Sequence, residues 1–402
     1  MTPGTATARE QPAIRPFQVN VPEEELADLR RRVLAARLPE RETVSDFSQG
    51  VPLDTVKKLA QYWATEYDWR KVEARLNSLP NFITEIDGLD IHFIHARSKH
   101  ENALPVIVSH GWPGSIVEQL KLIDPLTNPT AHGGTPDDAF HVVIPSMPGY
   151  GFSGKPTSTG WGPERIARTW DVLMKRLGYT SYVAQGGDWG AVIVELMGAQ
   201  APDGLLGIHT NMPNVVPPEI DVAAFTGAPM PAGLSTEEQH AYQMLTSFYK
   251  DVYYALFMGT RPQTLTALSD SPVGLATFMI DHDRRSLELI SRSFNGVAEG
   301  LTRDDVLDNV TLFWLTNTGV SAARLYWEKP ANLPFFTPKG VKVPVVASAF
   351  PDELYHAPRS WAEKAYPKLL RYNSLPKGGH FAAWEQPKSL YGEMREGFRS
   401  LR

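Results

Sequence analysis

The chain of 402 residues is 42% hydrophobic and 10% aromatic, which is typical of a globular enzyme and fits one large α/β domain with insertions. A net charge of −6, a pI near 6.0 and the lack of a signal-peptide or membrane-spanning apolar run argue against nucleic-acid and membrane partners and predict a cytoplasmic protein. Without cysteine the chain cannot use disulfides, thiol nucleophiles or thiolate metal sites, so its chemistry must rely on oxygen or imidazole.

The amino-terminal part is predicted to hold a helix and a pair of strands after a flexible stretch at residues 1–13. Residues 20–38 carry apolar side chains at helical spacing, and Asn20 and Glu23 are spaced as a capping box. The apolar positions of this amphipathic helix are Leu26, Leu29, Val33 and Leu38. Residues 82–86 and 91–94 flank the sequence Asp-Gly-Leu-Asp, which predicts two strands joined by a tight connection.

Beyond this pair, short apolar runs alternate with longer segments, as expected for a mostly parallel sheet that is covered on both faces. The runs occupy residues 106–108, 142–144, 182–184, 207–208 and 345–347. Between the last two lies a long interruption that begins with prolines and contains helix-like segments such as 237–256. We therefore predict an amino-terminal region at 14–95, an α/β core at 96–214 and 321–402, and an inserted helical lid at 215–320.

The sequence Gly-Gly-Asp-Trp-Gly-Ala at 186–191 has small residues wherever a nucleophile elbow requires them, with Asp188 in the nucleophile position. The glycines permit a sharp turn that holds the central side chain exposed in strained backbone geometry. An ordinary turn with an Asx hydrogen bond is the alternative that this local sequence leaves open. The order of residues along the rest of the chain favours the elbow.

Acidic and imidazole groups follow Asp188 in the chain order that enzymes of the α/β-hydrolase class use. Asp352 and Glu353 come directly after an apolar run, where a strand is predicted to end. His380 follows two glycines after a further strand-like run at 369–372. Asp188, one acid of the pair and His380 are therefore predicted to form a catalytic triad on an α/β-hydrolase fold.

Two loops that follow predicted strands agree with this fold. The sequence Ser-His-Gly-Trp-Pro-Gly after the first run lies where the fold places its second oxyanion donor, and a glycine-rich loop at 145–153 follows the next run. The backbone N–H groups of Trp112 and Trp189 are predicted to stabilise an oxyanion at Asp188.

Aspartate in the position of the usual serine predicts alkyl transfer in place of acyl transfer. With an ordinary pKa of about 3.9, aspartate is ionised at neutral pH and can displace a leaving group at a saturated carbon without a base. His380 is then free to deprotonate the water that hydrolyses the resulting ester. An epoxide oxygen leaves as an alkoxide and needs a hydrogen-bond donor, whereas a halide needs only a weak clamp. Candidate phenol donors are Tyr242, Tyr249, Tyr253, Tyr254 and Tyr326.

Six motifs make the chain resemble the microsomal-type epoxide hydrolases, a branch of the α/β-hydrolase family with an additional amino-terminal region. The motifs are HGWPGS at 110–115, MPGYGFS at 147–153, GGDWGA at 186–191, DSPVGL at 270–275, FPDELYHAP at 350–358 and GGHFAAWE at 378–385. The segment PFQVNVPEEELADLRRRV looks like that branch's amino-terminal domain, which packs against core and lid. No counterpart of the membrane-anchoring helix of mammalian members precedes it, so we expect a soluble protein.

This resemblance implies roles for individual residues of the triad. Asp188 would be the nucleophile, and His380 the base that activates water. Glu353 would be the acidic partner of His380, with the adjacent Asp352 as the alternative. The resemblance implies neither a metal nor an organic cofactor, and the expected partners are an epoxide and water. The sequence does not decide whether the protein forms a homodimer.

The resemblance also implies which lid residues meet the substrate. The first ring-opening tyrosine, just before Gly-Thr-Arg-Pro at 259–262, falls on Tyr254 with Tyr253 as the competitor, and the second falls on Tyr326. Around Tyr254 the chain lacks the family's preceding glycine and carries methionine where a glutamine is expected, which predicts a more apolar pocket. The aromatic-rich lid favours a bulky apolar or aromatic epoxide. The implied substrate contacts are Trp112, Pro113, Trp189, Met258 and Phe381.

Other functions are less compatible with these residues. Haloalkane dehalogenases use a similar Asp-Trp-Gly elbow, but generally place an asparagine after the His-Gly of the oxyanion loop, where this chain has Trp112. A non-catalytic receptor or scaffold on this fold usually lacks a triad member, and none is missing here. His282 between Asp281 and Asp283 could indicate a metal site, but a solvated turn or helix surface is the favoured interpretation.

Overall fold

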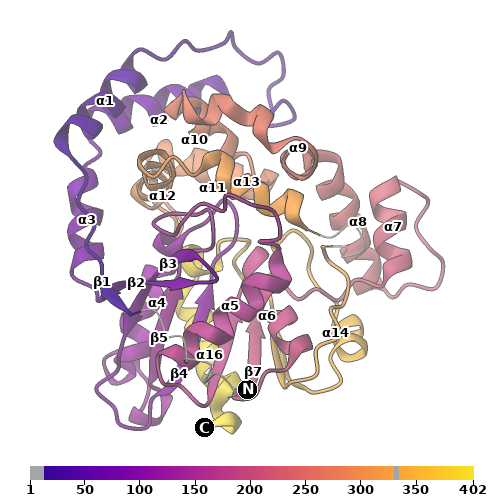
Figure 1. Ribbon diagram of the computed structural model, residues 1–402. Helices are drawn as coiled ribbons and strands as arrows, with labels where there is room; N and C mark the ends of the chain where they lie inside the picture. The colour runs from indigo at the N-terminus through magenta and orange to yellow at the C-terminus, as the bar shows by residue number, and fades with distance from the viewer. Residues whose placement is uncertain (1–12, 330–334) are drawn as a thin grey trace, which may run out of the picture.

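The computed structural model describes residues 13–329 and 335–402 (Figure 1). Of the flexible stretch predicted at 1–13, all but the last residue lies outside the described residues. A sheet occupies the lower part of the view, a group of helices lies above it, and the indigo amino-terminal helices run along the outside of that group. The predicted α/β fold with a mostly parallel sheet is confirmed.

Over the described residues the sheet has nine strands in the order β1-β2-β3-β5-β4-β6-β7-β8-β9. The pairs from β1 to β5 in this order are antiparallel, and every later pair is parallel. The strands are β1 (Arg15–Pro16), β2 (Asn81–Ile86), β3 (Leu89–Ala96), β4 (Leu104–Ser109), β5 (Phe140–Pro145), β6 (Tyr182–Gly186), β7 (Leu205–Thr210), β8 (Val345–Ala349) and β9 (Leu369–Ser374). Each predicted apolar run lies within one of the parallel strands. Strands β6 and β8 are buried along their whole length, because both faces of the sheet are covered.

The predicted hairpin joins β2 to β3 through a two-residue turn. Asp87 and Gly88 both have positive φ, 53° and 79°. This backbone matches the right-handed twist of the two strands, which is why Asp-Gly is a frequent hairpin turn. The register pairs Ile86 with Leu89 directly across the turn.

Two helix pairs flank the parallel strands: α5 packs against α6, and α4 packs against α16. The helices of the core are α4 (Leu120–Thr127), α5 (Pro163–Arg176), α6 (Trp189–Gln200), α14 (Arg359–Ala365), α15 (Ala382–Glu385) and α16 (Pro387–Phe398). Short 3-10 turns accompany them: η1 (Ile116–Gln119), η2 (Pro129–His132), η3 (Pro136–Asp138) and η5 (Arg399–Leu401). The carboxyl ends of the parallel strands, β4 to β9, point toward the helices above the sheet (Figure 1).

The amino-terminal helices are α1 (Glu23–Leu34), α2 (Leu53–Thr65) and α3 (Trp69–Asn77). Helix α1 buries the predicted Leu26, Leu29 and Val33, but the predicted span of 20–38 and the capping box are wrong. Pro22 occupies the N-cap without a side-chain cap, and a proline there disfavours helical backbone at the residue before it. Leu38 lies beyond the helix, immediately before Pro39.

Between β7 and β8 the chain forms the helices above the sheet. They are α7 (Pro218–Thr226), α8 (Thr236–Asp251), α9 (Tyr253–Thr260), η4 (Pro262–Ser269), α10 (Pro272–Ile280), α11 (Arg284–Phe294), α12 (Arg303–Leu315) and α13 (Gly319–Glu328). The helix-like segment expected at 237–256 is two helices, because Val252 leaves the helical region with ψ 32°. Apolar spacing continues on both sides of Val252, so periodicity cannot detect the break.

Helix α12 is anchored to the amino-terminal helices by hydrogen bonds. The indole Nε1 of Trp63 donates to Thr311 Oγ1 at 2.9 Å, and the hydroxyl of Tyr67 donates to Asp308 Oδ1 at 2.8 Å. Among the helices that the structure describes, none combines the length and the apolar composition needed to cross a membrane.

The buried imidazole of His92 in β3 makes stability depend on pH. Its Nδ1 lies 3.0 Å from Ser146 Oγ and its Nε2 3.0 Å from Asn81 Oδ1. Burial lowers the pKa of His92 to about 3. Since an unfolded histidine has a pKa of about 6.5, the unfolded state binds more protons between these values, and stability is lost as the pH falls through this window.

We expect this histidine to remove about 2 kcal/mol of unfolding free energy between pH 7 and pH 5. Urea unfolding at the two pH values measures the difference, which should shrink by about that amount in His92→Gln. The exposed His240→Gln serves as the control. An unchanged difference in His92→Gln would contradict the assignment of the neutral buried imidazole.

Candidate active site

Asp188 stands in a strained turn between β6 and α6. Its backbone has φ 52° and ψ −126°, a combination that is rare for any residue but glycine. A Cβ at Gly190 would lie 2.0 Å from the carbonyl oxygen of Ser109, so only glycine lets α6 begin this close to the end of β4. The turn places the Asp188 side chain beyond the carboxyl ends of the parallel strands, which confirms the predicted elbow geometry.

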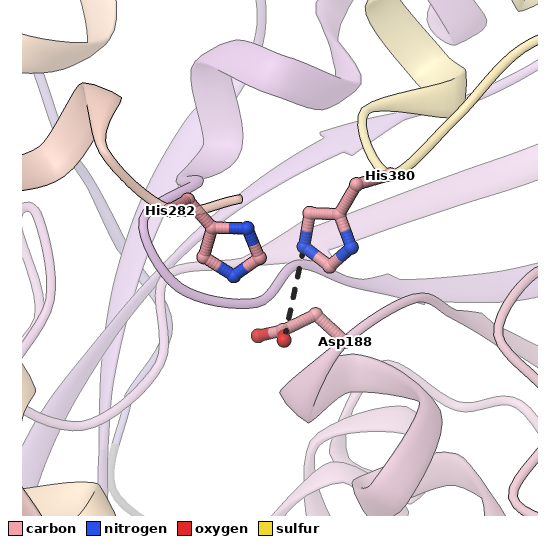
Figure 2. Close-up of side chains that lie close together, drawn as sticks. All are labelled: Asp188, His282 and His380. Atoms are coloured by element: carbon pink, nitrogen blue, oxygen red, sulfur yellow. Dashed lines mark ion pairs between the residues drawn. The ribbon is translucent and has the colours of Figure 1, made fainter. Parts of the chain in front are cut away.

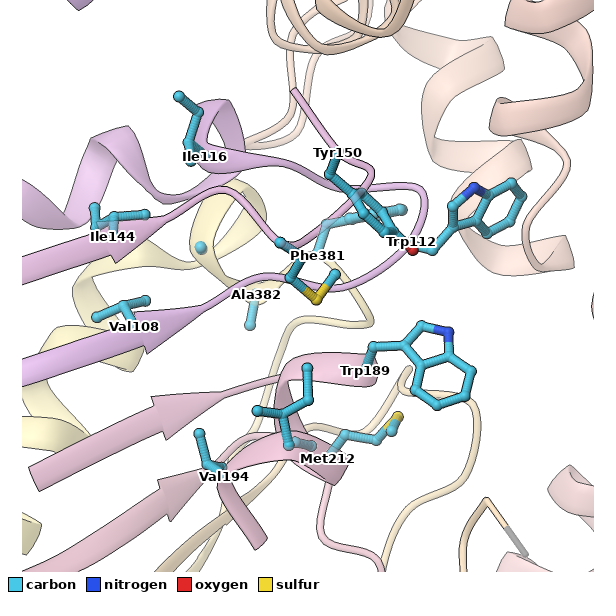
Figure 3. Packing of buried hydrophobic residues seen from close by; sticks show 14 of the residues in the cluster. Val108, Trp112, Ile116, Ile144, Tyr150, Trp189, Val194, Met212, Phe381 and Ala382 are labelled. Carbon is cyan, nitrogen blue, oxygen red and sulfur yellow. The ribbon is translucent and has the colours of Figure 1, made fainter. Parts of the chain in front are cut away.

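The loop after β4 closes over the carboxylate. The backbone N–H of Trp112 donates to Asp188 Oδ1 at 2.7 Å, and a Cβ at Gly111 would overlap the same oxygen at 2.3 Å. Burial raises the pKa of Asp188, while the charges of His380 and His282 and the N–H groups of Trp112 and Trp189 oppose this rise. In Figure 3 the rings of Trp112 and Trp189 lie beyond the strand ends, to the right of the aliphatic side chains of the core.

Glu353, and not its neighbour Asp352, contacts the histidine. His380 Nδ1 lies 2.6 Å from Glu353 Oε1, and both side chains are buried. Asp352 instead accepts a bond from Arg285 Nε at 3.2 Å, and its side chain is 38% exposed. The chain therefore brings Asp188, His380 and Glu353 together, as predicted for a triad.

His380 faces Asp188 with its other nitrogen. Nε2 lies 3.8 Å from Asp188 Oδ2, too far for a direct hydrogen bond. Burial alone would lower the pKa of His380, but the carboxylates of Glu353, Asp188 and Asp283 outweigh it and raise the pKa to about 10. The imidazole is therefore protonated at neutral pH for as long as Asp188 carries its negative charge.

The interpretation of His282 as part of a solvated surface is wrong. Its side chain is fully buried in the connection between α10 and α11, and its ring stacks on His380 with centroids 4.2 Å apart. Figure 2 shows its Nε2 directed toward Asp188, beside His380. Its Nδ1 lies 3.0 Å from Asp283 Oδ2, so a second histidine–carboxylate pair borders Asp188. The flanking aspartates suggested exposure, and only the fold buries the ring.

Two of the candidate phenols reach the site. Tyr254 stacks on Trp112 at 4.8 Å, and Tyr326 packs edge-on against Trp189 at 4.9 Å. The two phenol rings lie 6.2 Å apart and both are buried. Burial first, and then the charge of Asp188, raises the pKa of each phenol well above its usual value, so both stay protonated donors.

The remaining candidate phenols are bound elsewhere. Tyr253 is 46% exposed and donates to Asp281 Oδ2 at 2.8 Å, although it is adjacent to Tyr254. The hydroxyl of Tyr249 donates to Asp221, and that of Tyr242 donates to the carbonyl of Ala228.

Comparison with known proteins places this arrangement in a family. Models described as "Epoxide hydrolase N terminus" and "alpha/beta hydrolase fold" match residues 14–119 and 105–255. Epoxide hydrolase 1 of Oryctolagus cuniculus is 36% identical over 400 residues, which cover 95% of this chain and 88% of the rabbit protein. The chain belongs to the epoxide hydrolase family.

Solved structures agree over nearly the whole chain. Juvenile hormone epoxide hydrolase from the silkworm Bombyx mori matches with a TM-score of 0.83 at 29% identity, covering 98% of this chain and 96% of that chain. Aspergillus niger epoxide hydrolase matches with a TM-score of 0.82 at 31% identity, covering 97% of each chain. The protein is therefore an epoxide hydrolase with the α/β-hydrolase fold.

The other residues implied as substrate contacts of the epoxide hydrolase occupy different positions. Phe381 packs edge-on against His380 at 5.0 Å and borders the space beside Asp188. Pro113 is buried, and its carbonyl accepts a hydrogen bond from Asn309 Nδ2 at 2.7 Å, which secures the loop after β4 to α12. Met258 is fully buried on α9.

Within the described part of the chain, Asp188, His282 and His380 form the group with metal-ligand spacing, their donor atoms lying within 4.8 Å of one another. The two histidines of this group are the ones whose rings border the Asp188 carboxylate. Sequence reasoning also missed Glu118, a carboxyl on η1 that borders the same space. No motif identified it, because its approach to Asp188 follows from the packing of η1.

Removing the carboxylate of Glu353 should lower the pKa of His380, since Glu353 contributes most to its rise. We expect the NMR titration of the His380 ring to move to lower pH in Glu353→Gln. Asp352→Asn, whose side chain bonds Arg285, should leave the titration close to that of the parent enzyme. A larger shift in Asp352→Asn than in Glu353→Gln would contradict the geometry described for the pair.

Proposed function

We propose that this epoxide hydrolase converts a bulky apolar or aromatic epoxide to a vicinal diol through a covalent ester on Asp188. The observation that carries the proposal is a buried carboxylate that lies between two buried phenols and a histidine–glutamate pair. A carboxylate supplies the nucleophile, the phenols supply donors for a poor leaving group, and the imidazole supplies a base. The carboxylate and the phenols are needed for opening the epoxide, and the imidazole is needed for hydrolysis of the ester. The phenols are the groups that displacement of a halide would not require.

In the first step a carboxylate oxygen of Asp188 attacks one ring carbon and the carbon–oxygen bond of the epoxide breaks. The phenol of Tyr254 or Tyr326 gives its proton to the departing oxygen, which leaves a hydroxyl on the ester and a phenolate on the enzyme. Esterification removes the charge of Asp188, and that charge is one of the causes that raise the pKa of His380. The imidazolium can then return a proton to the phenolate and become a neutral base.

In the second step water loses a proton to His380 Nε2 and its oxygen attacks the carbonyl carbon of the ester. The N–H groups of Trp112 and Trp189 stabilise the oxyanion. The ester bond breaks, and the released alkoxide takes the proton of the new carboxylic acid to complete the diol. Asp188 is again a carboxylate, and His380 is again protonated. One oxygen of the water remains on Asp188.

The chemistry of the surrounding side chains favours an apolar epoxide. The rings of Trp112, Tyr254, Tyr326 and Trp189 form a continuous aromatic group, and Phe278 packs edge-on against Trp112 at 5.8 Å. The faces of these rings are apolar, so an aromatic or aliphatic substituent is favoured over a charged one.

Replacing the base should trap the ester. Exposure of His380→Gln to an aryl epoxide should increase the intact mass by that of the whole epoxide, with the added group mapping to Asp188. The exposed His240→Gln should retain turnover and carry no adduct. A gain of only the alkyl group, from a bromoalkane and not from the epoxide, would contradict the proposal in favour of halide displacement.

Removing either phenol should slow ester formation. We expect Tyr254→Phe and Tyr326→Phe each to keep residual activity, and the double variant to lose about 10²–10⁴ in the rate of alkylation, the range of general acid catalysis. Tyr253→Phe is the matched control, since this hydroxyl bonds Asp281. Rapid-quench mass measurement of the ester tests the order of these rates, and an unimpaired double variant would refute the acid assignment.

A further inference from the structure

A small cavity lies beside the nucleophile, on the side of the oxyanion loop. Its volume is about 10 Å³, close to the smallest that can hold one water. It is bordered by Asp188, His380, Glu118, Gly111, Gly114 and Phe381. A buried water needs two to four polar partners, and the first three residues offer a carboxyl, an imidazole nitrogen and a second carboxyl.

The Glu118 carboxyl reaches this cavity because of the glycine before it in the loop. A Cβ at Gly114 would lie 2.1 Å from Glu118 Oε2, so any larger residue would occupy the place of the carboxyl. Glu118 belongs to η1, which also packs against α15, the helix that follows His380 and Phe381. The Glu118 side chain is therefore held between the loop that follows β4 and the loop that carries His380.

Glu118 has no structural bond that would explain its position. No residue in the described ranges donates a hydrogen bond to its carboxyl, and its backbone N–H donates to the carbonyl of Ser115. Burial first, and then the charges of Asp188, Glu353 and Glu385, raises the pKa of Glu118 to about 8, although the charge of His380 opposes this. At neutral pH the carboxyl is mostly uncharged, so it does not repel a hydroxide forming beside it.

We propose that Glu118 holds the water that hydrolyses the ester. This proposal rests on the proposed function. The water donates one O–H to His380 Nε2 and the other to the Glu118 carboxyl, and the water oxygen faces the carbonyl carbon of the Asp188 ester. Proton transfer to Nε2 and formation of the carbon–oxygen bond then follow without movement of the water. The released alkoxide takes the proton left on the carboxylic acid, so Glu118 itself gains and loses no proton.

The distance from His380 Nε2 to Asp188 Oδ2 supports this position. At 3.8 Å the two groups do not bond directly, and a water in the adjacent cavity can contact both. The phenols of Tyr254 and Tyr326 are not among the residues that border this cavity. Ring opening and ester hydrolysis therefore use separate faces of Asp188, and loss of Glu118 should affect only the second step.

The test is to follow the alkyl-enzyme in single turnovers with an aryl epoxide, by rapid quench and intact mass, in the full-length chain. In Glu118→Ala we expect alkylation at nearly the parent rate, hydrolysis of the ester slowed at least about tenfold, and accumulated alkyl-enzyme. Both kcat and KM should fall, because the slow step follows the ester. Glu118→Gln keeps an acceptor oxygen and the side-chain volume, so it should lose less than Glu118→Ala.

Glu101→Gln, an exposed change after β3, serves as the control and should match the parent enzyme in both steps. Hydrolysis of the ester at the parent rate in Glu118→Ala would overturn the proposal, as would equal slowing of alkylation and hydrolysis. The absence of any ester in His380→Gln would instead refute the proposed function. The two failures are therefore distinguishable.

Discussion

The left-handed backbone of Asp188 is the constraint on which the rest of the site depends. A residue with a side chain in this region costs on the order of 1–3 kcal/mol and persists only when the surroundings hold it. Here the surroundings are β6 on one side and α6 on the other, with Gly190 packed against the carbonyl of Ser109. The strain places a carboxylate at the edge of the sheet, within reach of the Trp112 N–H.

The groups around this carboxylate come from separate parts of the chain, and α12 connects several of them. One side of α12 bonds the amino-terminal region through Thr311 and Asp308, and Asn309 on the same helix bonds the carbonyl of Pro113. The amino-terminal helices therefore support the loop after β4 through α12. This gives a physical reason for the additional amino-terminal region to accompany the hydrolase fold.

Buried ionisable groups are concentrated at the site, where three carboxyl groups lie near two imidazoles. Asp188, Glu353 and Asp283 face His380 and His282, and Asp283 has its pKa lowered to about 2, because the bond and charge of His282 and the charge of His380 outweigh its burial. In the proposed mechanism, esterification of Asp188 removes one negative charge from this group. The charge around His380 then differs between the two proposed steps, which would link ring opening to hydrolysis.

The sequence by itself determined the parallel strands, the elbow, the chain order of the triad and the family, because these depend on local apolar runs, on glycine geometry and on short motifs. It left open whether Glu353 or Asp352 is the acidic partner of His380, and whether Tyr254 or Tyr253 points to the site. Adjacent residues share every local signal and differ only in the direction of the side chain. Tertiary structure decided these placements through the turn after β8 and the break at Val252. It also buried His282 and brought Glu118 to the nucleophile, since both contacts join segments far apart in the chain, where no periodicity or spacing in the sequence can report them.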